Sequence, residues 1–194
     1  SGTLSGAGGG NNTPQWESTN GGVFNFDGTD DEIDFPSSTL GAGLSNFSIL
    51  AWAKLIGTDT GYESIVSVDG PAGRVWNLFE WSTNRGWGFQ LINNSGNSVY
   101  TPISAVSTSS NIWYNVVGTY DGNNARLYVD GVLKATVTQT GPLRVSTTEN
   151  LKIGNNGYNE YLSGDIGPVQ IYNRALSASE VLHNYNALKG RFGL

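Results

Sequence analysis

The sequence predicts an all-β fold: a two-sheet antiparallel jelly-roll sandwich with one short C-terminal helix. Segments with strand character follow one another at intervals of about eight to twelve residues, which is typical of sandwiches and barrels. Glycine accounts for 27 of the 194 residues, about twice its average share, as expected for short strands joined by tight turns. An Asp130-Gly131 dipeptide separates two alternating segments and predicts a hairpin turn.

The expected strands divide the chain into a loose N-terminal segment and one domain. Residues 1–20 are rich in Gly, Ser and Asn and form a flexible lead-in that pairs with a sheet only around Trp16. Residues 21–194 form the single jelly-roll domain. Residues 47–55 are apolar on both faces, so this strand is expected at the centre of a sheet. The expected strands are 23–26, 32–35, 47–55, 64–68, 75–81, 86–92, 98–103, 112–120, 125–129, 132–137, 151–154 and 161–172.

One helix is expected near the C-terminus. Ser177 and Glu180 form the Ser-x-x-Glu capping box that starts many helices. The residues that follow place an apolar stripe at helical spacing, made of Val181, Leu182, Tyr185 and Leu188. Gly190 is expected to end the helix in the left-handed conformation, and the helix is expected to pack on a sheet surface or edge.

Composition and charge exclude several classes of protein. The chain carries 16 acidic and 10 basic residues, for a net charge of −6, so no nucleic-acid partner is expected. It has no cysteine, which removes disulfides, thiol catalysis and zinc–thiolate sites. No apolar stretch is long enough for a spanning helix, so no membrane insertion is expected. Low charge and abundant neutral polar residues favour a virion-surface or extracellular location.

Three sequence segments, taken together, carry a family resemblance. They are FDGTDD at 26–31, WYNVVGTYDG at 113–122 followed by LYVDG at 127–131, and YNRALS at 172–177. They resemble the laminin-G-like group of the concanavalin A-like lectin/glucanase superfamily, over residues 20–188. The resemblance implies a two-sheet jelly roll, frequent glycan or protein binding and often a structural calcium ion, and it does not imply catalysis. The final segment, 184–194, resembles the C-termini of structural proteins from marine tailed phages.

Candidate catalytic groups are few. The glucanase branch of the superfamily carries an E-x-D-x-x-E motif, whose carboxylates flank a glycosidic bond. Glu32 and Asp34 occupy the first two positions here, but Ser37 stands at the third. His183 is the only histidine and falls within the expected helix, and no serine lies in a G-x-S-x-G elbow. The sequence therefore predicts no enzyme, with a degenerate glycosidase that uses Asp34 as a remote alternative.

A structural calcium site is expected at an Asp-rich turn. Asp27, Asp30 and Asp31 supply three carboxylates within five residues, and calcium prefers such oxygen ligands. The resemblance places this turn near the last long strand, where the family often has a G-x-I-D motif. This chain has Gly167 at the usual Asp position and Asp165 two residues earlier, on the same strand face, where it is expected to compensate. The alternative is a turn whose aspartates bond only their own backbone.

Aromatic residues around the strands at 75–81 and 86–92 are candidates for glycan contact. Sugar rings stack on aromatic side chains, and amides or charged groups bond their hydroxyls. Trp76 shares a face with Leu78, and Trp81 shares the other with Phe79, so only one face lies in the core. The alternative is that these tryptophans protect a sheet edge or pack under a loop. The candidate ligand-binding residues are Tyr62, Trp76, Trp81, Asn84, Arg85, Trp87 and Tyr158, with Glu80, Asn156 and Tyr161 as further lining residues.

Two functions from different classes follow. The first is a non-catalytic carbohydrate-binding or adhesion module, displayed on a virion or extracellular surface, whose partner is a glycan or polysaccharide. The alternative is a structural or decoration subunit of a phage particle or appendage, which contacts neighbouring virion or appendage proteins. In that case the N-terminal lead-in and the C-terminal tail, with apolar Phe192 and Leu194, would be docking arms.

Overall fold

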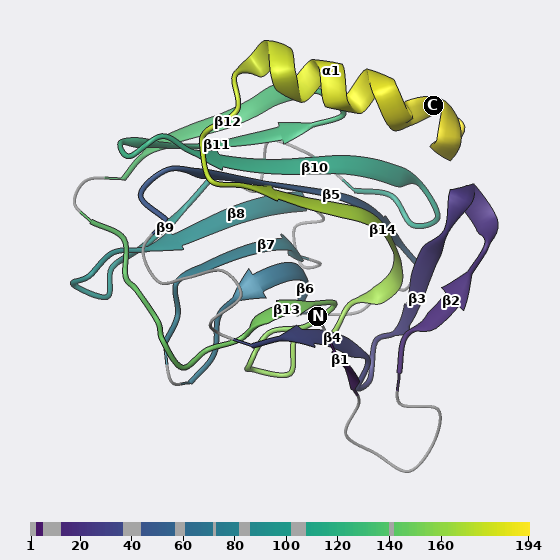
Figure 1. The fold of residues 1–194 in the computed structure, drawn as a ribbon, viewed down its shortest axis with the longest axis horizontal. Helices are drawn as coiled ribbons and strands as arrows, with labels where there is room; N and C mark the ends of the chain where they lie inside the picture. Colours follow the sequence, from purple (N-terminus) through teal and green to yellow (C-terminus); the bar gives the residue numbers. More distant parts are fainter. Residues whose placement is uncertain are drawn as a thin grey trace.

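The computed structural model describes residues 3–5, 13–36, 44–56, 61–71, 73–81, 86–101, 108–139 and 142–194. Two antiparallel sheets pack face to face, and the C-terminal helix lies on one of them (Figure 1), so the predicted jelly-roll sandwich is confirmed. Sheet A has the order β1 (Thr3–Ser5), β4 (Glu32–Phe35), β13 (Leu151–Ile153), β6 (Tyr62–Val68), β7 (Trp76–Trp81), β8 (Gly86–Ile92) and β9 (Ser98–Tyr100). Sheet B has the order β12 (Val132–Thr138), β11 (Asn124–Val129), β10 (Trp113–Tyr120), β5 (Phe47–Leu55), β14 (Ser163–Tyr172), β3 (Val23–Asp27) and β2 (Gln15–Glu17).

The expected strands form within a few residues of their expected ends. β5 coincides with the segment 47–55 and lies inside sheet B, between β10 and β14. The lead-in contributes more structure than expected. β2 pairs with β3 around Trp16, as expected, and β1 also pairs with β4. Both are short strands at sheet edges, and so short a segment carries too little pattern to predict a strand.

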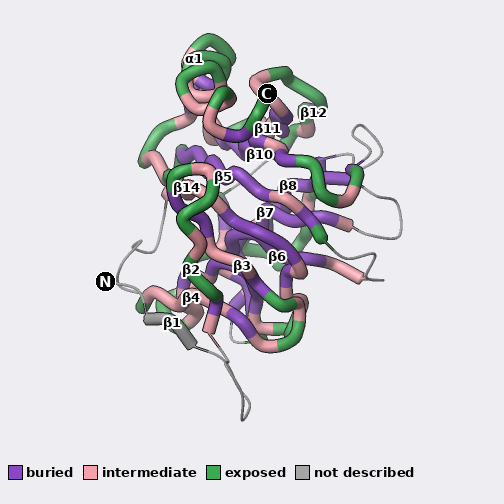
Figure 2. Tube along the Cα trace, turned by 90° about the vertical axis from the view of Figure 1, so that its right-hand side faces the viewer, coloured by how far each residue is buried: buried purple, intermediate pink, exposed green. Residues whose placement is uncertain are grey.

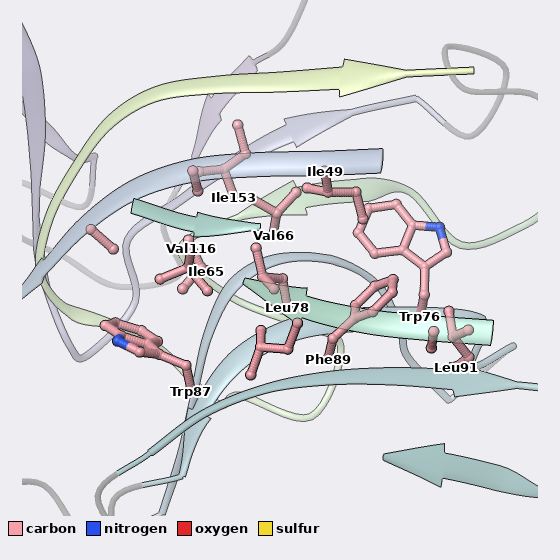
Figure 3. Packing of buried hydrophobic residues seen from close by; sticks show 14 of the residues in the cluster. Ile49, Ile65, Val66, Trp76, Leu78, Trp87, Phe89, Leu91, Val116 and Ile153 are labelled. Carbon is pink, nitrogen blue, oxygen red and sulfur yellow. The ribbon is translucent and has the colours of Figure 1, made fainter. Parts of the chain in front are cut away.

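The main hydrophobic core lies between the inner faces of the two sheets (Figure 3). Alternation along β7 turns Trp76 and Leu78 inward, and β8 contributes Trp87 and Phe89. These side chains meet inward residues of sheet B such as Ile49. Burial of apolar surface stabilises by about 25 cal/mol per Å², so this layer is the main source of stability and fixes which strand faces remain outside.

The helix α1 (Ala178–Leu188) covers part of the outer face of sheet B. Ser177 Oγ accepts a hydrogen bond from Glu180 N, and the Glu180 carboxylate accepts one from Ser177 N, so the predicted capping box is confirmed. Val181 joins a buried cluster with Leu50 of β5 and Tyr128 of β11. Figure 2 shows the rest of α1 as a mixture of exposed and partly buried residues above the buried strands. The helix therefore docks on the sheet surface, as expected, through Val181, whereas Leu182 of the predicted stripe is 44% exposed.

The C-terminal tail folds back on sheet B. The chain continues from α1 into a 3-10 helix, η3 (Lys189–Phe192), which contains Gly190. Gly193, with φ of 77°, takes the left-handed position that the sequence analysis gave to Gly190. Phe192 is buried against Trp52 of β5. Its ring therefore belongs to the domain itself and is not free to dock on a neighbour.

The outer face of sheet A carries no helix in the part of the chain that the structure describes. Asn77, Phe79 and Trp81 of β7 point to this face, opposite the core residues of the same strand. The two outer faces therefore differ: the C-terminal segment packs on that of sheet B, whereas no described helix packs on that of sheet A, where Asn77 and Phe79 are nevertheless buried. None of the described helices is both long and apolar enough to cross a membrane.

Candidate functional site

Aromatic side chains from β6, β7 and β9 cluster on the outer face of sheet A. The rings of Tyr62 and Trp81 stack with centroids 4.9 Å apart and an interplanar angle of 21°. Phe79 lies 5.3 Å from Tyr62 and 6.3 Å from Tyr100, centroid to centroid. Tyr62 and Trp81 are partly exposed, and Tyr100 is exposed. With Tyr158, described below, these residues form what we call the aromatic face.

A glycine on the neighbouring strand makes room for this cluster. Gly88 of β8 pairs with Phe79, and a Cβ atom on Gly88 would lie 2.5 Å from Phe79 Cζ. The Phe79 ring therefore packs over the backbone of β8 and is only 1% exposed. It supports Tyr62 and Tyr100 from below, so the exposed rings rest on a fixed base.

Two buried amides hold the polar atoms around these rings. Gln90 Nε2 donates to Tyr100 Oη at 2.8 Å and to Ser98 Oγ at 3.3 Å. Asn77 Oδ1 accepts a hydrogen bond from Ser64 Oγ at 2.7 Å. Gln90 and Asn77 are both buried; Gln90 positions the exposed Ser98 and Tyr100, whereas Asn77 binds the buried Ser64.

An arginine lies against the aromatic face. Arg74 Nε donates to Asp69 Oδ1 at 2.7 Å, and Nη2 donates to Oδ2 at 3.1 Å, which makes a two-pronged ion pair. The guanidinium carbon also lies 4.8 Å from the ring centroid of Tyr158, within the range of a cation–π interaction. Burial raises the pKa of Asp69, against the opposing effect of Arg74. Arg74 keeps 37% of its side chain exposed, so its planar fork is held in place and is still accessible.

The loop between β13 and β14 brings Tyr158 and Glu160 to the same place. Asn156 Oδ1 accepts hydrogen bonds from the backbone N–H groups of Tyr158 and Glu160, and Asn156 Nδ2 donates to Glu160 Oε2 at 2.5 Å. Ser64 N donates to Glu160 O, which ties the loop to β6. Burial raises the pKa of Glu160. The buried amide of Asn156 thus organises the loop that carries one ring and one carboxylate.

Electrostatic coupling shows that these groups form one cluster. Burial raises the pKa of Tyr62; Tyr100 and Glu160 act in the same direction, and Arg74 opposes them. A raised pKa keeps the Tyr62 hydroxyl protonated at neutral pH, so it can donate as well as accept a hydrogen bond. The surface therefore combines stacking rings with hydroxyl, guanidinium and carboxylate groups.

Five of the residues that the sequence analysis singled out lie at or beside this surface, and three do not. Tyr62, Trp81 and Tyr158 belong to the aromatic face, Asn156 organises its loop, and Tyr161 follows Glu160. The assignment of Trp76 and Trp87 to a ligand site is wrong, because both rings lie in the core (Figure 3). Glu80 also points away from this face, and its Oε1 accepts a hydrogen bond from Thr108 Oγ1. Asn84 and Arg85 lie outside the described residues.

Sequence reasoning missed several members of the cluster. Phe79 shares a strand face with Trp81, so alternation along β7 already pointed to it. Tyr100 lies in the weak strand β9, and Arg74, Asp69 and Glu160 come from loops. Loop residues carry no periodic pattern, so only the fold brings them together.

The Asp-rich turn gathers three of the four expected calcium ligands. Carboxylate oxygens of Asp27, Asp30 and Asp31 lie within 4.8 Å of one another. Asp31 is buried; its Oδ2 accepts a hydrogen bond from Asp27 N, whereas its Oδ1 has no hydrogen-bond partner among the described residues. Asp27 Oδ1 accepts hydrogen bonds from Thr29 N and Asp30 N. A buried, unsatisfied carboxylate oxygen beside two further carboxylates fits a hard cation.

Asp165 lies apart from this turn. Its Oδ2 forms an ion pair with Lys54 Nζ at 2.5 Å, and its Oδ1 accepts a hydrogen bond from Asn25 Nδ2 at 2.7 Å. Ser163, two residues earlier, is the residue that pairs with Asp27. Asp165 therefore does not compensate for the missing family aspartate, because its two carboxylate oxygens bind Lys54 and Asn25 of sheet B.

The Glu32 and Asp34 carboxylates lie on the outer face of sheet A, and Lys152 joins them. Lys152 Nζ lies 2.9 Å from both Glu32 oxygens and 3.4 Å from Asp34 Oδ1. Asn150 Nδ2 and Asn155 Nδ2 donate further hydrogen bonds to Asp34 and Glu32. Both carboxylates are thus part of a charged network across β4 and β13.

Comparison with known families agrees with this architecture. Residues 27–182 match the Laminin_G_3 family, described as the concanavalin A-like lectin/glucanases superfamily. The chain belongs to this superfamily. No curated protein sequence matches the chain.

Solved members of similar fold come from proteins of different kinds. Domain 4 of an extracellular GH43 arabinanase from Geobacillus stearothermophilus, determined in complex with arabinotriose, superposes with a TM-score of 0.73 at 17% identity, covering 94% of this chain and 86% of that one. The ligand-binding domain of botulinum neurotoxin serotype D, in complex with N-acetylneuraminic acid, gives 0.74 at 16% identity, covering 96% and 46%. The binding domain of Paraclostridial Mosquitocidal Protein 1 gives 0.70 at 16% identity, covering 95% and 51%. The chain spans about half of each of these two toxin domains.

Proposed function

We propose that this domain is a non-catalytic carbohydrate-binding module whose ligand lies on the aromatic face. The observation that carries the proposal is a cluster of partly exposed rings on the outer face of sheet A, beside a guanidinium and a carboxylate. Tyr62, Trp81 and Tyr100 offer the rings, and Arg74 and Glu160 the charged groups. The C–H faces of a sugar stack on aromatic rings, and its hydroxyls bond to charged side chains.

The solved structures of similar fold support this proposal. Domain 4 of the arabinanase and the serotype D toxin domain were determined with arabinotriose and N-acetylneuraminic acid. At 17% identity or less the likeness concerns the fold, so the argument for this chain depends on its own aromatic face.

Binding without catalysis is proposed because the two candidate carboxylates share one lysine. A glycosidase needs one carboxyl group that is protonated and one that is free to attack or to activate water. Lys152 lies between Glu32 and Asp34 and forms an ion pair with each carboxylate. The pair is therefore better suited to holding β4 against β13 than to catalysis.

A structural calcium ion and display outside the cell or on a virion complete the proposal. Asp27, Asp30 and Asp31 would hold the ion, which would neutralise the charge at the turn and take no part in chemistry. A shallow surface gives weak affinity for a single sugar site, and display of many copies raises it. The low charge and the phage-like C-terminal segment favour such display.

A glycan array on the purified protein, with calcium and with a chelator, tests the proposed function. The wild type is expected to bind a defined glycan class, and Trp81→Ala to lose that binding by about tenfold or more, because one stacking platform is removed. Trp16→Ala is the matched control, since Trp16 is 63% exposed on β2 of sheet B. An empty array at high multivalent density would overturn the proposal and favour a structural subunit. Equal loss in both variants would overturn the choice of face.

A further inference from the structure

We infer that the aromatic face selects uncharged glycans and discriminates against acidic ones. This inference rests on the proposed function and names the ligand class for the same surface. It follows from how charge is distributed on sheet A and on the two loops beside it.

Both cations on the described part of this face already have carboxylate partners. Arg74 is engaged by Asp69 through two hydrogen bonds. Lys152 is engaged by Glu32 and Asp34. Glu160 adds a further carboxylate, which an uncharged amide binds. An incoming carboxylate or sulfate beside the rings would therefore meet two carboxylates, Asp69 and Glu160, against the single guanidinium of Arg74, and close like charges cost several kcal/mol at an interface.

The geometry of the charged groups suits hydroxyls. A guanidinium only donates hydrogen bonds and an ionised carboxylate only accepts them, whereas a hydroxyl does both. Adjacent hydroxyls of a neutral sugar can thus accept from Arg74 and donate to Glu160. A sugar carboxylate in the same place would present acceptors to Glu160, with no proton to share at neutral pH.

Burial makes a second anion more costly. The pKa of Glu160 is raised by burial, and Asp69 acts in the same direction. The site already disfavours negative charge before a ligand arrives. Burial also raises the pKa of the nearby Tyr62 hydroxyl, and Glu160 acts in the same direction, so this group too disfavours a further negative charge.

Glycan pairs that differ only in charge test the inference. Suitable probes are the methyl ester of 3′-sialyllactose against 3′-sialyllactose itself, and methyl-esterified against de-esterified polygalacturonan, titrated with the full chain in 50 and 500 mM NaCl. We expect the neutral member to bind about tenfold tighter or more. Its affinity should change by less than about twofold with salt, because no ion pair forms. Glu160→Gln should reduce the preference several-fold, whereas Glu17→Gln, which removes the same charge on β2 of sheet B, should leave it unchanged.

The possible outcomes distinguish failure of this inference from failure of the proposed function. Tighter binding of acidic members, weakened by salt, would overturn the inference and leave carbohydrate binding intact. If Arg85→Gln abolished this preference for acidic members, the preference would be assigned to Arg85, which lies outside the described residues. The inference would be overturned in that case too. Absence of binding to either member of every pair, on the array as well, would overturn the proposed function itself.

Discussion

The phenyl ring of Phe192 lies almost parallel to the indole of Trp52, with centroids 4.2 Å apart and an interplanar angle of 14°. Tyr62 and Trp81 form a similar stacked pair on the opposite sheet, at 4.9 Å and 21°. The first pair is buried beneath the end of the chain, whereas both members of the second are partly exposed. Stacked aromatic rings thus hold the C-terminal tail on sheet B, whereas on sheet A the stacked pair is partly exposed, where we propose that the ligand binds.

Phe192→Ala is expected to destabilise the domain. The change removes a ring that packs on Trp52 and Trp113 and should lower the free energy of unfolding by about 3 kcal/mol. Urea denaturation measures it. Leu194→Ala is the control, because Leu194 is exposed, and its effect should stay within about 0.5 kcal/mol. Equal stability of Phe192→Ala and the wild type would mean that the tail is not part of the fold.

Gly88→Ala is expected to disturb the aromatic face from below. The new methyl group would meet Phe79 Cζ at 2.5 Å, and displacement of a packed ring costs about 1 to 3 kcal/mol. Thermal unfolding should show this loss, and glycan affinity should fall with it because Tyr62 and Tyr100 rest on Phe79. Gly61→Ala has open space around its Cβ position, so neither quantity should change. A stable Gly88→Ala with full affinity would refute the supporting role of Phe79.

Local patterns predicted the fold well because each strand, hairpin and cap depends on residues close in sequence. The capping box at Ser177 and Glu180 formed as predicted. Alternation also showed that Trp76 and Trp81 lie on opposite faces of β7, but it does not say which face is inward. The inward face of β7 carries the charged residue Glu80, and the outward face carries the apolar residue Phe79. The distribution of polar and apolar residues along β7 therefore did not indicate which face is inward.

The candidate site was harder to predict because its polar groups come from distant loops. Asp69 and Arg74 follow β6, whereas Tyr158 and Glu160 follow β13, and the Gly157 N–H bonds to Asp69 O across that separation. Tyr158 and the loop amide Asn156 were candidates from the sequence. The ion pair between Asp69 and Arg74 and the position of Glu160 became evident only in the assembled fold.

Arg74→Gln is expected to destabilise the domain in a pH-dependent way. Burial raises the pKa of Asp69 above its ordinary value of 3.8, so the folded protein binds this proton more tightly than the unfolded chain does. The free energy of unfolding therefore falls as pH rises from 3.8 through the raised pKa. Loss of Arg74 removes the opposing interaction and raises that pKa further. The variant should be less stable by about 2 kcal/mol at pH 7, below the cost for a fully buried pair because Arg74 is 37% exposed.

The pH profile distinguishes this charge effect from simple loss of packing. The stability difference between Arg74→Gln and the wild type should shrink as pH falls below the raised pKa of Asp69, because the carboxyl is then protonated in both. Arg126→Gln, which breaks the more exposed pair with Asp121, is the control and should cost less than about 1 kcal/mol. A difference for Arg74→Gln that is constant from pH 4 to pH 7 would contradict the assignment to Asp69.

Calcium is expected to stabilise the domain through Asp31. Burial raises the pKa of Asp31, and the charges of Asp27 and Asp30 act in the same direction, so the metal-free turn has a costly buried carboxylate. A bound cation offsets that cost. A free calcium concentration one hundred times the dissociation constant adds about 2.7 kcal/mol to the free energy of unfolding. Thermal unfolding in calcium and in chelator at pH 7 should show the shift, and a lower pH should weaken it because the carboxylates protonate.

Two asparagine variants decide which aspartates take part. Asp31→Asn should abolish the calcium response and leave the metal-free protein at least as stable as the wild type, since a buried charge beside two others is gone. Asp165→Asn should lower stability through loss of the Lys54 pair and keep the full calcium response. If both variants lost the response, Asp165 would be a ligand after all and would compensate for the family aspartate that Gly167 replaces. If the wild type showed none, the three aspartates would serve only their own turn, through the hydrogen bonds that Asp27 and Asp31 accept from its backbone.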